Sequence, residues 1–315
     1  MVGRRSRAFC VHPVVASRAK FGGAVAYTIG HMNGVLGLAG WRWLFIIEGI
    51  PSCFSAIFVF FFLPDYPESA SWLSGSEKAL AAKRLLHEGS KSCHKTASWT
   101  DAKATLMDWR LYVHYALYFA VNSPFAGLSL FAPSLTSGLG FRDLDAQLMT
   151  VPSWAVAYVC QIAVAYSADR FNARGAHMAG AALVGAAGFA ASAALPATAY
   201  KARYGALFMA TSGTFASVPP MLGWLTSNLF STASTGLAVA INVSVGGGLG
   251  QIPGVWIYKP AEASLGYPTG HWTNAAFLLL VAVMALALRF FYVGENGRLA
   301  AEAERRGVQT RLYKL

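Results

Sequence analysis

The stretch GWRWLFIIEGIPSCFSAIFVFFFLPDYPESASWL, residues 40–73, decides the structural class of this protein. Residues 43–63 within it are apolar apart from a few small polar residues and one charge, Glu48. A helix needs about 20 such residues to cross the hydrocarbon core of a bilayer. The polar run PDYPES ends the apolar stretch. We therefore predict a transmembrane helix that leaves the bilayer near Pro64.

The whole chain has the composition of a lipid-exposed protein. Of its 315 residues, 55% are hydrophobic and only 12% are charged, whereas soluble domains carry roughly 25% charged residues. Seven further segments have the length of a span. The first of them, residues 21–38, is rich in glycine and is the weakest candidate. The fold class predicted is an all-α integral membrane bundle. Its eight predicted spans are residues 21–38, 43–63, 111–131, 148–166, 176–195, 204–229, 237–258 and 272–293.

The distribution of basic residues sets the expected orientation. Eight spans place both chain ends on the same side of the membrane. Cytosolic segments of membrane proteins are enriched in Lys and Arg, so we expect a multi-pass protein with both termini in the cytosol. The same asymmetry accounts for the net charge of +11, and nucleic acid is not expected as a partner. Of the 25 Lys and Arg residues, twenty fall on that side; the other five are Arg42, Arg142, Lys201, Arg203 and Lys259.

Motifs for metal binding, redox chemistry and ATP hydrolysis are missing from the sequence. The seven histidines show no HExxH spacing, no Walker A sequence occurs, and acids or histidines do not cluster at one interface. We expect no metal, no cofactor and no enzymatic activity. The four cysteines form no CxxC pair and are interpreted as buried thiols, not as a disulfide framework or a metal site: Cys10, Cys53, Cys93 and Cys160.

One long polar loop, residues 64–108, divides the predicted spans into two before it and six after it. Within it lies SGSEKALAAKRLL, residues 74–86, with a glutamate three positions after Ser74. This spacing is that of a capping box, in which the serine and the glutamate satisfy each other's free main-chain N–H groups. We predict a surface helix here, on the cytosolic side.

Several long blocks carry a family resemblance. They are GWRWLFIIEGIP (40–51), FFFLPDYPESASWL (60–73), YFAVNSPFAGLSLFAPSLTSGLGF (118–141), LMTVPSWAVAYVCQIAVAYSADR (148–170) and SVPPMLGWLTSNL (217–229). With these blocks the chain resembles the major facilitator superfamily, and more narrowly the fungal allantoate permease branch of the anion:cation symporters. The resemblance runs from about residue 22 to residue 295.

The resemblance implies a domain organisation. Members of that family have twelve spans in two six-helix halves joined by an inside loop, so this chain corresponds to spans five to twelve. We therefore expect a truncated or wrongly assigned reading frame that lacks the first four spans, with a true eight-span protein as the alternative. The expected parts are a lead-in without family resemblance (1–20), the last two helices of the N-terminal half (21–63), the central cytosolic loop (64–108), the C-terminal six-helix half (109–294) and a cytosolic tail (295–315).

The resemblance also implies a function. It points to proton-coupled symport of a small organic anion, such as a vitamin-like carboxylate or a ureide, by a monomeric protein of the plasma membrane. The partners are then the lipid bilayer, the anion and a proton, with the anion bound near the midplane between the two halves. The alternative is a non-transporting fragment of such a transporter, because a translocation path needs both halves.

Polar residues inside three spans are the candidates for the substrate cavity. Tyr118 and Asn122 precede a proline, which leaves a helix carbonyl without its usual donor. Trp224 and Asn228 are four residues apart and share a helix face, giving an aromatic plate and an amide for a small anion. Asn242 is the candidate in the seventh span. The alternative for each is ordinary hydrogen bonding between helices.

The candidate gating element is a group of charges at the end of the fourth span. Asp169, Arg170 and Arg174 match the D-R-x-x-x-R-like loop that the superfamily carries at the corresponding place. The resemblance implies a charge latch that bonds a helix end as the halves rock. The alternative is a solvated positive loop.

Glu48 is the candidate for proton coupling. It lies about 10 Å into its span at a rise of 1.5 Å per residue, and intramembrane acids are commonly functional. It can also pair with Arg42 or cap a helix broken before Pro51. The family keeps an acid in this block regardless of substrate, so the resemblance favours the structural role.

Two features of the last spans receive a structural interpretation. The glycine run 246–248 indicates close helix packing or a hinge. His271 and Trp272 lie at the predicted outer interface, where aromatic anchors are expected. A proton-relay role for His271 is the weaker alternative.

Overall fold

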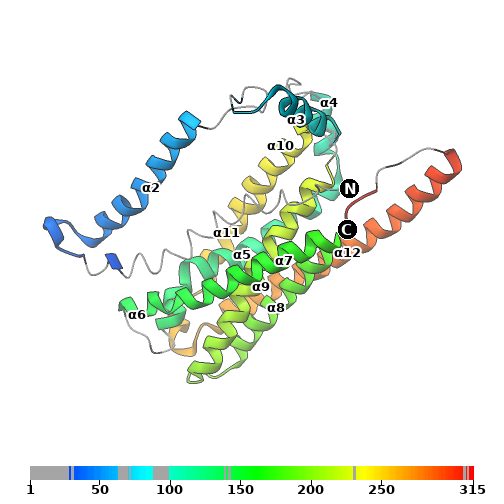
Figure 1. The fold of residues 1–315 in the computed structure, drawn as a ribbon. Coiled ribbons are helices and arrows are strands. Elements are labelled where there is room, and N and C mark those ends of the chain that lie inside the picture. The colour runs from blue at the N-terminus through cyan, green and yellow to red at the C-terminus, as the bar shows by residue number, and fades with distance from the viewer. Residues whose placement is uncertain are drawn as a thin grey trace.

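The computed structural model of the chain describes residues 28–29, 32–62, 70, 72–87, 99–137, 140, 143–229, 232–307, 310 and 312–315. In these ranges all regular structure is helical, which confirms the predicted class (Figure 1). The helices are η1 (Val35–Gly37), α2 (Gly40–Phe62), α3 (Gly75–His87), α4 (Trp99–Leu106), α5 (Trp109–Ser137), α6 (Asp143–Leu148), α7 (Thr150–Phe171), α8 (Arg174–Ala194), α9 (Tyr200–Ser227), α10 (Thr232–Ile241), the π-helix η2 (Asn242–Leu249), α11 (Gly250–Trp256), η3 (Pro260–Leu265) and α12 (Pro268–Arg306).

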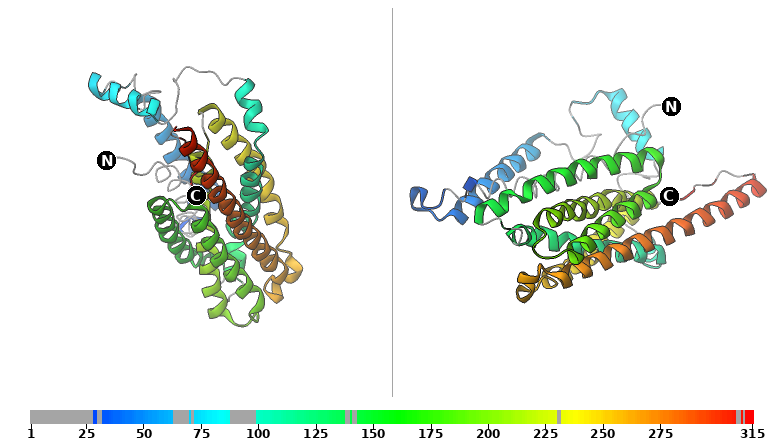
Figure 2. Two further views of the ribbon diagram at one scale, coloured as in Figure 1. Left: turned by 90° about the vertical axis from the view of Figure 1, so that its right-hand side faces the viewer. Right: turned by 90° about the horizontal axis from the view of Figure 1, so that it is seen from below.

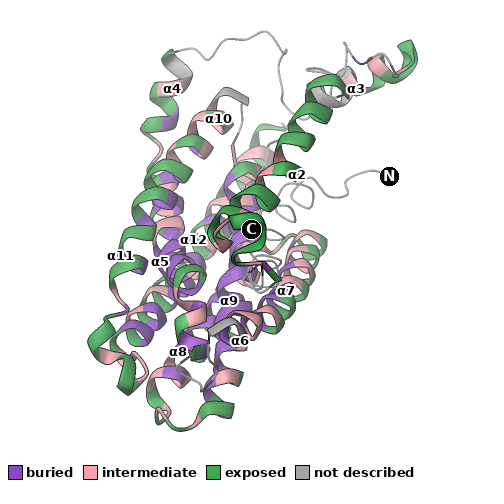
Figure 3. Cartoon of the chain, turned by 90° about the vertical axis from the view of Figure 1, so that its left-hand side faces the viewer, coloured by how far each residue is buried: buried purple, intermediate pink, exposed green. Residues whose placement is uncertain are grey.

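Most of the long helices form one bundle around α9. Helix α8 packs against α9 and α12, α7 packs against α9, and α5 lies against α9, α11 and α12 (Figure 2). Residues that are buried lie mainly where the helices face one another, and exposed residues lie mainly on the outside (Figure 3). Large apolar residues such as Phe290 are among the exposed ones. An apolar exterior around a filled core is the pattern of a bundle surrounded by lipid.

Each predicted span from residue 43 onward coincides with a long helix, or, for residues 237–258, with α10, η2 and α11 in succession. Five stretches of the described residues are long and apolar enough to cross a membrane: Gly40–Phe62, Asp145–Phe171, Arg174–Ala194, Ser234–Trp256 and Pro268–Arg306. Helices α5 and α9 have 29 and 28 residues, which suffices in length. Both helices are less apolar than the five stretches because they carry more polar residues, and many of these side chains are buried inside the bundle.

Some predictions fall outside the described residues. These are the lead-in 1–20, residues 21–27 and 30–31 of the first predicted span, and two stretches of the long loop, 64–69 and 88–98. The transmembrane helix predicted at 21–38 is wrong for its described second half, because residues 32–37 form turns and the short 3-10 helix η1, with positive φ at Gly34, Leu36 and Gly37.

Helix α2 stands away from the bundle (Figure 1). None of its residues is buried, and Phe54 and Phe60 are 71% and 81% exposed. A helix that is apolar on every side needs lipid or another apolar protein surface around it.

The predicted capping box starts α3. The Ser74 main-chain N–H donates to Glu77 Oε2 at 3.0 Å, the Ser74 hydroxyl donates to the same oxygen at 2.8 Å, and the Glu77 N–H donates back to Ser74 Oγ at 3.4 Å. The surface helix predicted at 74–86 is therefore confirmed. These hydrogen bonds from Ser74 lower the pKa of the Glu77 carboxyl below its usual value of 4.5.

Replacing Ser74 with alanine should loosen the start of α3. The variant loses an N-cap, and main-chain amides of the first turn should exchange about fivefold faster with solvent. Because the pKa of Glu77 is lowered, the ionised carboxylate stabilises the start of α3 above pH 4.5. This stabilisation is lost as the pH falls through the lowered pKa. Acid should therefore mimic the substitution in hydrogen exchange. Lys83→Ala, on the same helix but away from the cap, should leave these amides unchanged.

Glycines bring the helices together along the seam between α5 and the consecutive helices η2 and α11. A Cβ placed on Gly250 or Gly254 of α11 would lie 2.6 Å from the Phe119 carbonyl oxygen or 2.3 Å from the Ser123 carbonyl oxygen of α5. The ring of Tyr118 packs over Gly246 and Gly247 in the same way. Close packing, as predicted for the run 246–248, is confirmed for its first two glycines, while Gly248 faces open space.

Candidate functional site

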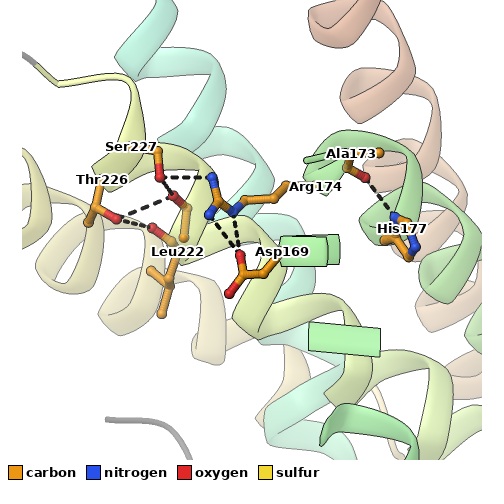
Figure 4. A network of polar contacts seen from close by, with 8 residues as sticks. Asp169, Ala173, Arg174, His177, Leu222, Thr226 and Ser227 are labelled. Carbon is orange, nitrogen blue, oxygen red and sulfur yellow. Dashed lines mark hydrogen bonds and ion pairs between the residues drawn. The ribbon is translucent and has the colours of Figure 1, made fainter. Parts of the chain in front are cut away.

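The candidate latch forms at the turn between α7 and α8. Asn172 takes a left-handed conformation, with φ 51°, and reverses the chain between the two helices. Arg174 donates from Nε and Nη2 to Asp169 Oδ1 at 2.9 and 2.7 Å, and from Nη1 to Ser227 Oγ on α9 at 2.9 Å (Figure 4). One guanidinium group thus joins the ends of three helices. We call this end of the bundle the latch end.

Two histidine contacts brace the same turn. His177 Nδ1 lies 2.8 Å from the Ala173 carbonyl oxygen, and its Nε2 lies 2.8 Å from Ser167 Oγ. A carbonyl only accepts, so Nδ1 donates, and Nε2 of a neutral ring accepts the Ser167 hydroxyl proton. Sequence reasoning missed both His177 and Ser227. The only available signal was their position one turn from a predicted helix end.

Arg170 does not belong to this network. Its side chain is exposed, whereas that of Arg174 is 15% exposed. The three charges predicted together therefore separate into a bonded pair, Asp169 with Arg174, and a neighbour that faces away from it.

The cavity candidates lie in two places. Asn122 is 5% exposed and donates from Nδ2 to the Tyr118 carbonyl oxygen at 2.7 Å. Asn242 begins η2 and is 1% exposed, and its Oδ1 has no partner among the described residues. Helix α5 and η2 pack along each other. Tyr118, Asn122 and Asn242 therefore belong to one seam.

Trp224 and Asn228 lie elsewhere, at the latch end. They share a helix face as predicted, but both bond the same main-chain group. Trp224 Nε1 donates to the Lys314 carbonyl oxygen at 2.8 Å and Asn228 Nδ2 donates to it at 3.1 Å. The structure does not bring this pair together with Asn122 and Asn242 into one wall.

Glu48 is exposed on α2. Neither structural alternative predicted for it is found. Glu48 and Arg42 form no ion pair, because residues six apart on a helix point about 120° away from each other. The helix also runs on through Pro51 to Phe62, so no broken end is there to cap. Its proton-coupling role stays a prediction.

A second polar cluster lies at the opposite end of the bundle. The Tyr258 hydroxyl and His271 Nδ1 are 3.4 Å apart, and Asn274 Nδ2 donates to that hydroxyl at 3.0 Å. His271, in the first turn of α12, is 3% exposed and faces the bundle interior, whereas its neighbour Trp272 is 53% exposed, as an aromatic anchor should be. Sequence reasoning missed this cluster, because Tyr258 is distant in sequence from the other two.

Comparison with known proteins assigns the family. The Major Facilitator Superfamily matches residues 15–255. The chain is 59% identical over 295 residues to the MFS transporter prlL of a fungus, strain NRRL 50135, covering 93% of this chain and 59% of that protein. It is 30% identical over 292 residues to the MFS-type transporter cnsO of Penicillium expansum, covering 88% and 55%. It is also 30% identical over 271 residues to a putative tartrate transporter of Agrobacterium vitis, covering 85% and 58%.

The chain thus spans between 55% and 59% of the length of these curated relatives. The match covers more than half of the chain and agrees with its strand-free described fold and its five apolar span-length helices. This protein belongs to the Major Facilitator Superfamily of multi-pass membrane proteins.

Proposed function

We propose that this protein acts in secondary transport of a small organic anion coupled to a proton, with residues 109–294 forming the C-terminal six-helix half of the transporter. The family assignment supports transport as the activity. The name of one relative, a putative tartrate transporter, supports a small carboxylate as the substrate class. The narrower likeness to allantoate permeases leaves ureides and vitamin-like acids in the same class.

One observation carries the proposal. Eight buried side-chain atoms lack a hydrogen-bond partner among the described residues, including Ser123 Oγ of α5, Ser212 Oγ of α9 and Asn242 Oδ1 of η2. Ser123 is the middle residue of α5, Ser212 lies near the middle of α9, and Asn242 lies near the middle of the α10–η2–α11 run. Buried polar groups are normally satisfied. Unused hydrogen-bonding capacity at mid-depth is what a polar substrate bound near the midplane needs.

The orientation and location are part of the proposal. Arg110, Arg170 and Arg174 lie at helix ends that meet at the latch end, so we place this end, with both termini, on the cytosolic side of a plasma membrane. Asp169 and Arg174 then act as the cytosolic latch, and Glu48 is the candidate proton carrier. The protein is expected to be monomeric.

A transport assay tests the proposal. The purified protein in proteoliposomes should take up labelled tartrate, or another small carboxylate from a panel, faster when the outside is acidic. Ser123→Ala with Ser212→Ala should weaken apparent substrate affinity roughly tenfold or more, since hydrogen bonds to charged groups contribute about 1.5–3 kcal/mol each. Ser129→Ala, on the same helix α5 but exposed, is the matched control.

The outcomes separate the two candidate functions. Uptake by the 315-residue chain would exclude a non-transporting fragment. Uptake that is unaffected by the double substitution would remove the midplane serines from the site. The absence of acid-stimulated uptake for every carboxylate tested would contradict proton-coupled anion transport by this chain.

A further inference from the structure

The last residues of the chain lie back against the latch end, although α12 itself projects well beyond the bundle (Figure 1). Lys314 is held there through its main chain. Its N–H donates to Asn228 Oδ1 at 2.7 Å, and its carbonyl oxygen accepts from Asn228 Nδ2 and Trp224 Nε1. The next carbonyl oxygen, of Leu315, accepts from the Arg174 main-chain N–H at 2.6 Å.

Tyr313 is held in the same manner from the other side. Its N–H donates to Asn296 Oδ1 at 2.7 Å, and its carbonyl oxygen accepts from Asn296 Nδ2 at 2.9 Å. Its ring stacks on Tyr292, with centroids 5.0 Å apart and planes at 23°. Its hydroxyl bonds to the guanidinium of Arg110, whose Cζ lies 4.9 Å from the ring centroid.

Two features make this a built binding site. Asn228 and Asn296 each bond both main-chain groups of one residue, which is recognition of peptide backbone independent of side-chain identity. Tyr292 and Arg110 both contact the Tyr313 ring, Trp224 packs edge-on against Tyr292, and aromatic residues with arginine are the usual anchors of protein interfaces. The partners come from the start of α5 and α8, the end of α9 and the later part of α12.

We propose that the latch end carries a binding site for an extended peptide segment, that residues 312–315 are its resident ligand, and that their docking clamps α5, α8, α9 and α12 together. The clamp shares Arg174 with the latch, because the side chain of Arg174 bonds Asp169 while its main chain bonds Leu315. Release of the segment would leave the latch and the contact between Ser167 and His177 to join the helices at this end. This clamp can form whatever substrate the protein transports.

Hydrogen exchange tests the docking in the intact chain. In purified protein in detergent micelles, the Tyr313 and Lys314 amides should exchange at least about tenfold more slowly than in an unstructured peptide of the same sequence. Asn228→Ala should release the Lys314 amide, and Asn296→Ala should release the Tyr313 amide. Thr226→Ala on α9 and Arg298→Ala on α12 are exposed neighbours that bond only within their own helices, and should release neither.

A second measurement tests the site without its own ligand. A chain ending at residue 307 should bind a fluorescent peptide of sequence TRLYKL, residues 310–315, saturably, and a peptide with Tyr313→Ala should bind at least about tenfold more weakly. The Tyr313 substitution sits in the peptide and cannot unfold the bundle. Unprotected amides in the intact chain, or equal binding of both peptides, would overturn the inference.

Discussion

Replacing Gly213 with leucine is expected to prevent this protein from forming a stable bundle. Gly213 lies on α9 where α9 crosses α8. A Cβ atom at this position would be 2.1 Å from the Gly185 nitrogen, 2.4 Å from the Gly185 Cα and 2.6 Å from the Ala181 carbonyl oxygen. All three atoms belong to the α8 main chain, which cannot rotate out of the way as a side chain can.

The two helices would therefore have to separate, and their interface is the most extensive in the fold. Extra methylene groups in a well-packed core typically cost about 1–3 kcal/mol even where side chains can adjust. We expect Gly213→Leu to lower the free energy of unfolding by more than about 3 kcal/mol, a large part of the 5–15 kcal/mol typical of folded proteins. Gly213→Ala already introduces the clashing atom and should be strongly destabilising as well.

Gly205→Leu is the matched control. It introduces the same side chain on the same helix, but Gly205 is exposed and a Cβ there meets nothing within 4 Å. Size-exclusion chromatography in detergent micelles should give a sharp monomeric peak for Gly205→Leu and aggregated or poorly expressed protein for Gly213→Leu. Thermal unfolding in the same micelles should give a lower melting temperature for Gly213→Leu. Equal melting temperatures for the two variants would contradict the close-packing argument.

The sequence predicted what depends on local pattern. Apolar length located the spans from residue 43 onward, and the Ser74–Glu77 spacing located α3. Both signals lie within one helix, where residue type and periodicity determine the structure directly. The projection of α12 beyond residue 293 was not predicted, because the stretch AAEAERR after the span is polar. Its alanines and charged side chains nevertheless favour helix strongly.

The candidate site was predicted only in part, because its contacts join residues that are distant in sequence. Helical spacing predicted that Trp224 and Asn228 share a face. Their common hydrogen-bond acceptor, the Lys314 carbonyl oxygen, is 90 residues from Trp224 and 86 residues from Asn228. Nothing in a periodic pattern identifies such a partner. The same reason explains why Ser227 was missed as the third member of the latch, 53 residues from Arg174.

Replacing Arg174 with alanine is expected to loosen the latch end more than any other single charge removal in the described turn. The substitution deletes two hydrogen bonds to Asp169 and one to Ser227, which together join α7, α8 and α9. Asp169→Ala deletes only the first two. Because the Arg174 side chain is 15% exposed and that of Asp169 is 30% exposed, solvent screens the pair partly. We expect a loss of roughly 2 kcal/mol for Asp169→Ala and more for Arg174→Ala.

A double-mutant cycle separates the ion pair from the rest of each side chain. Chemical denaturation of Asp169→Ala, Arg174→Ala and the double variant should give a coupling energy of about 1–2 kcal/mol that decreases with added salt. Arg170→Ala is the matched control, since it removes an adjacent arginine that is exposed and outside the network. If Arg170→Ala destabilised the protein as much as Arg174→Ala, or the coupling were zero, the group would be an ordinary solvated positive loop. A measured coupling would instead establish an energetic tie between the ends of α7 and α8, which is what the proposed latch requires.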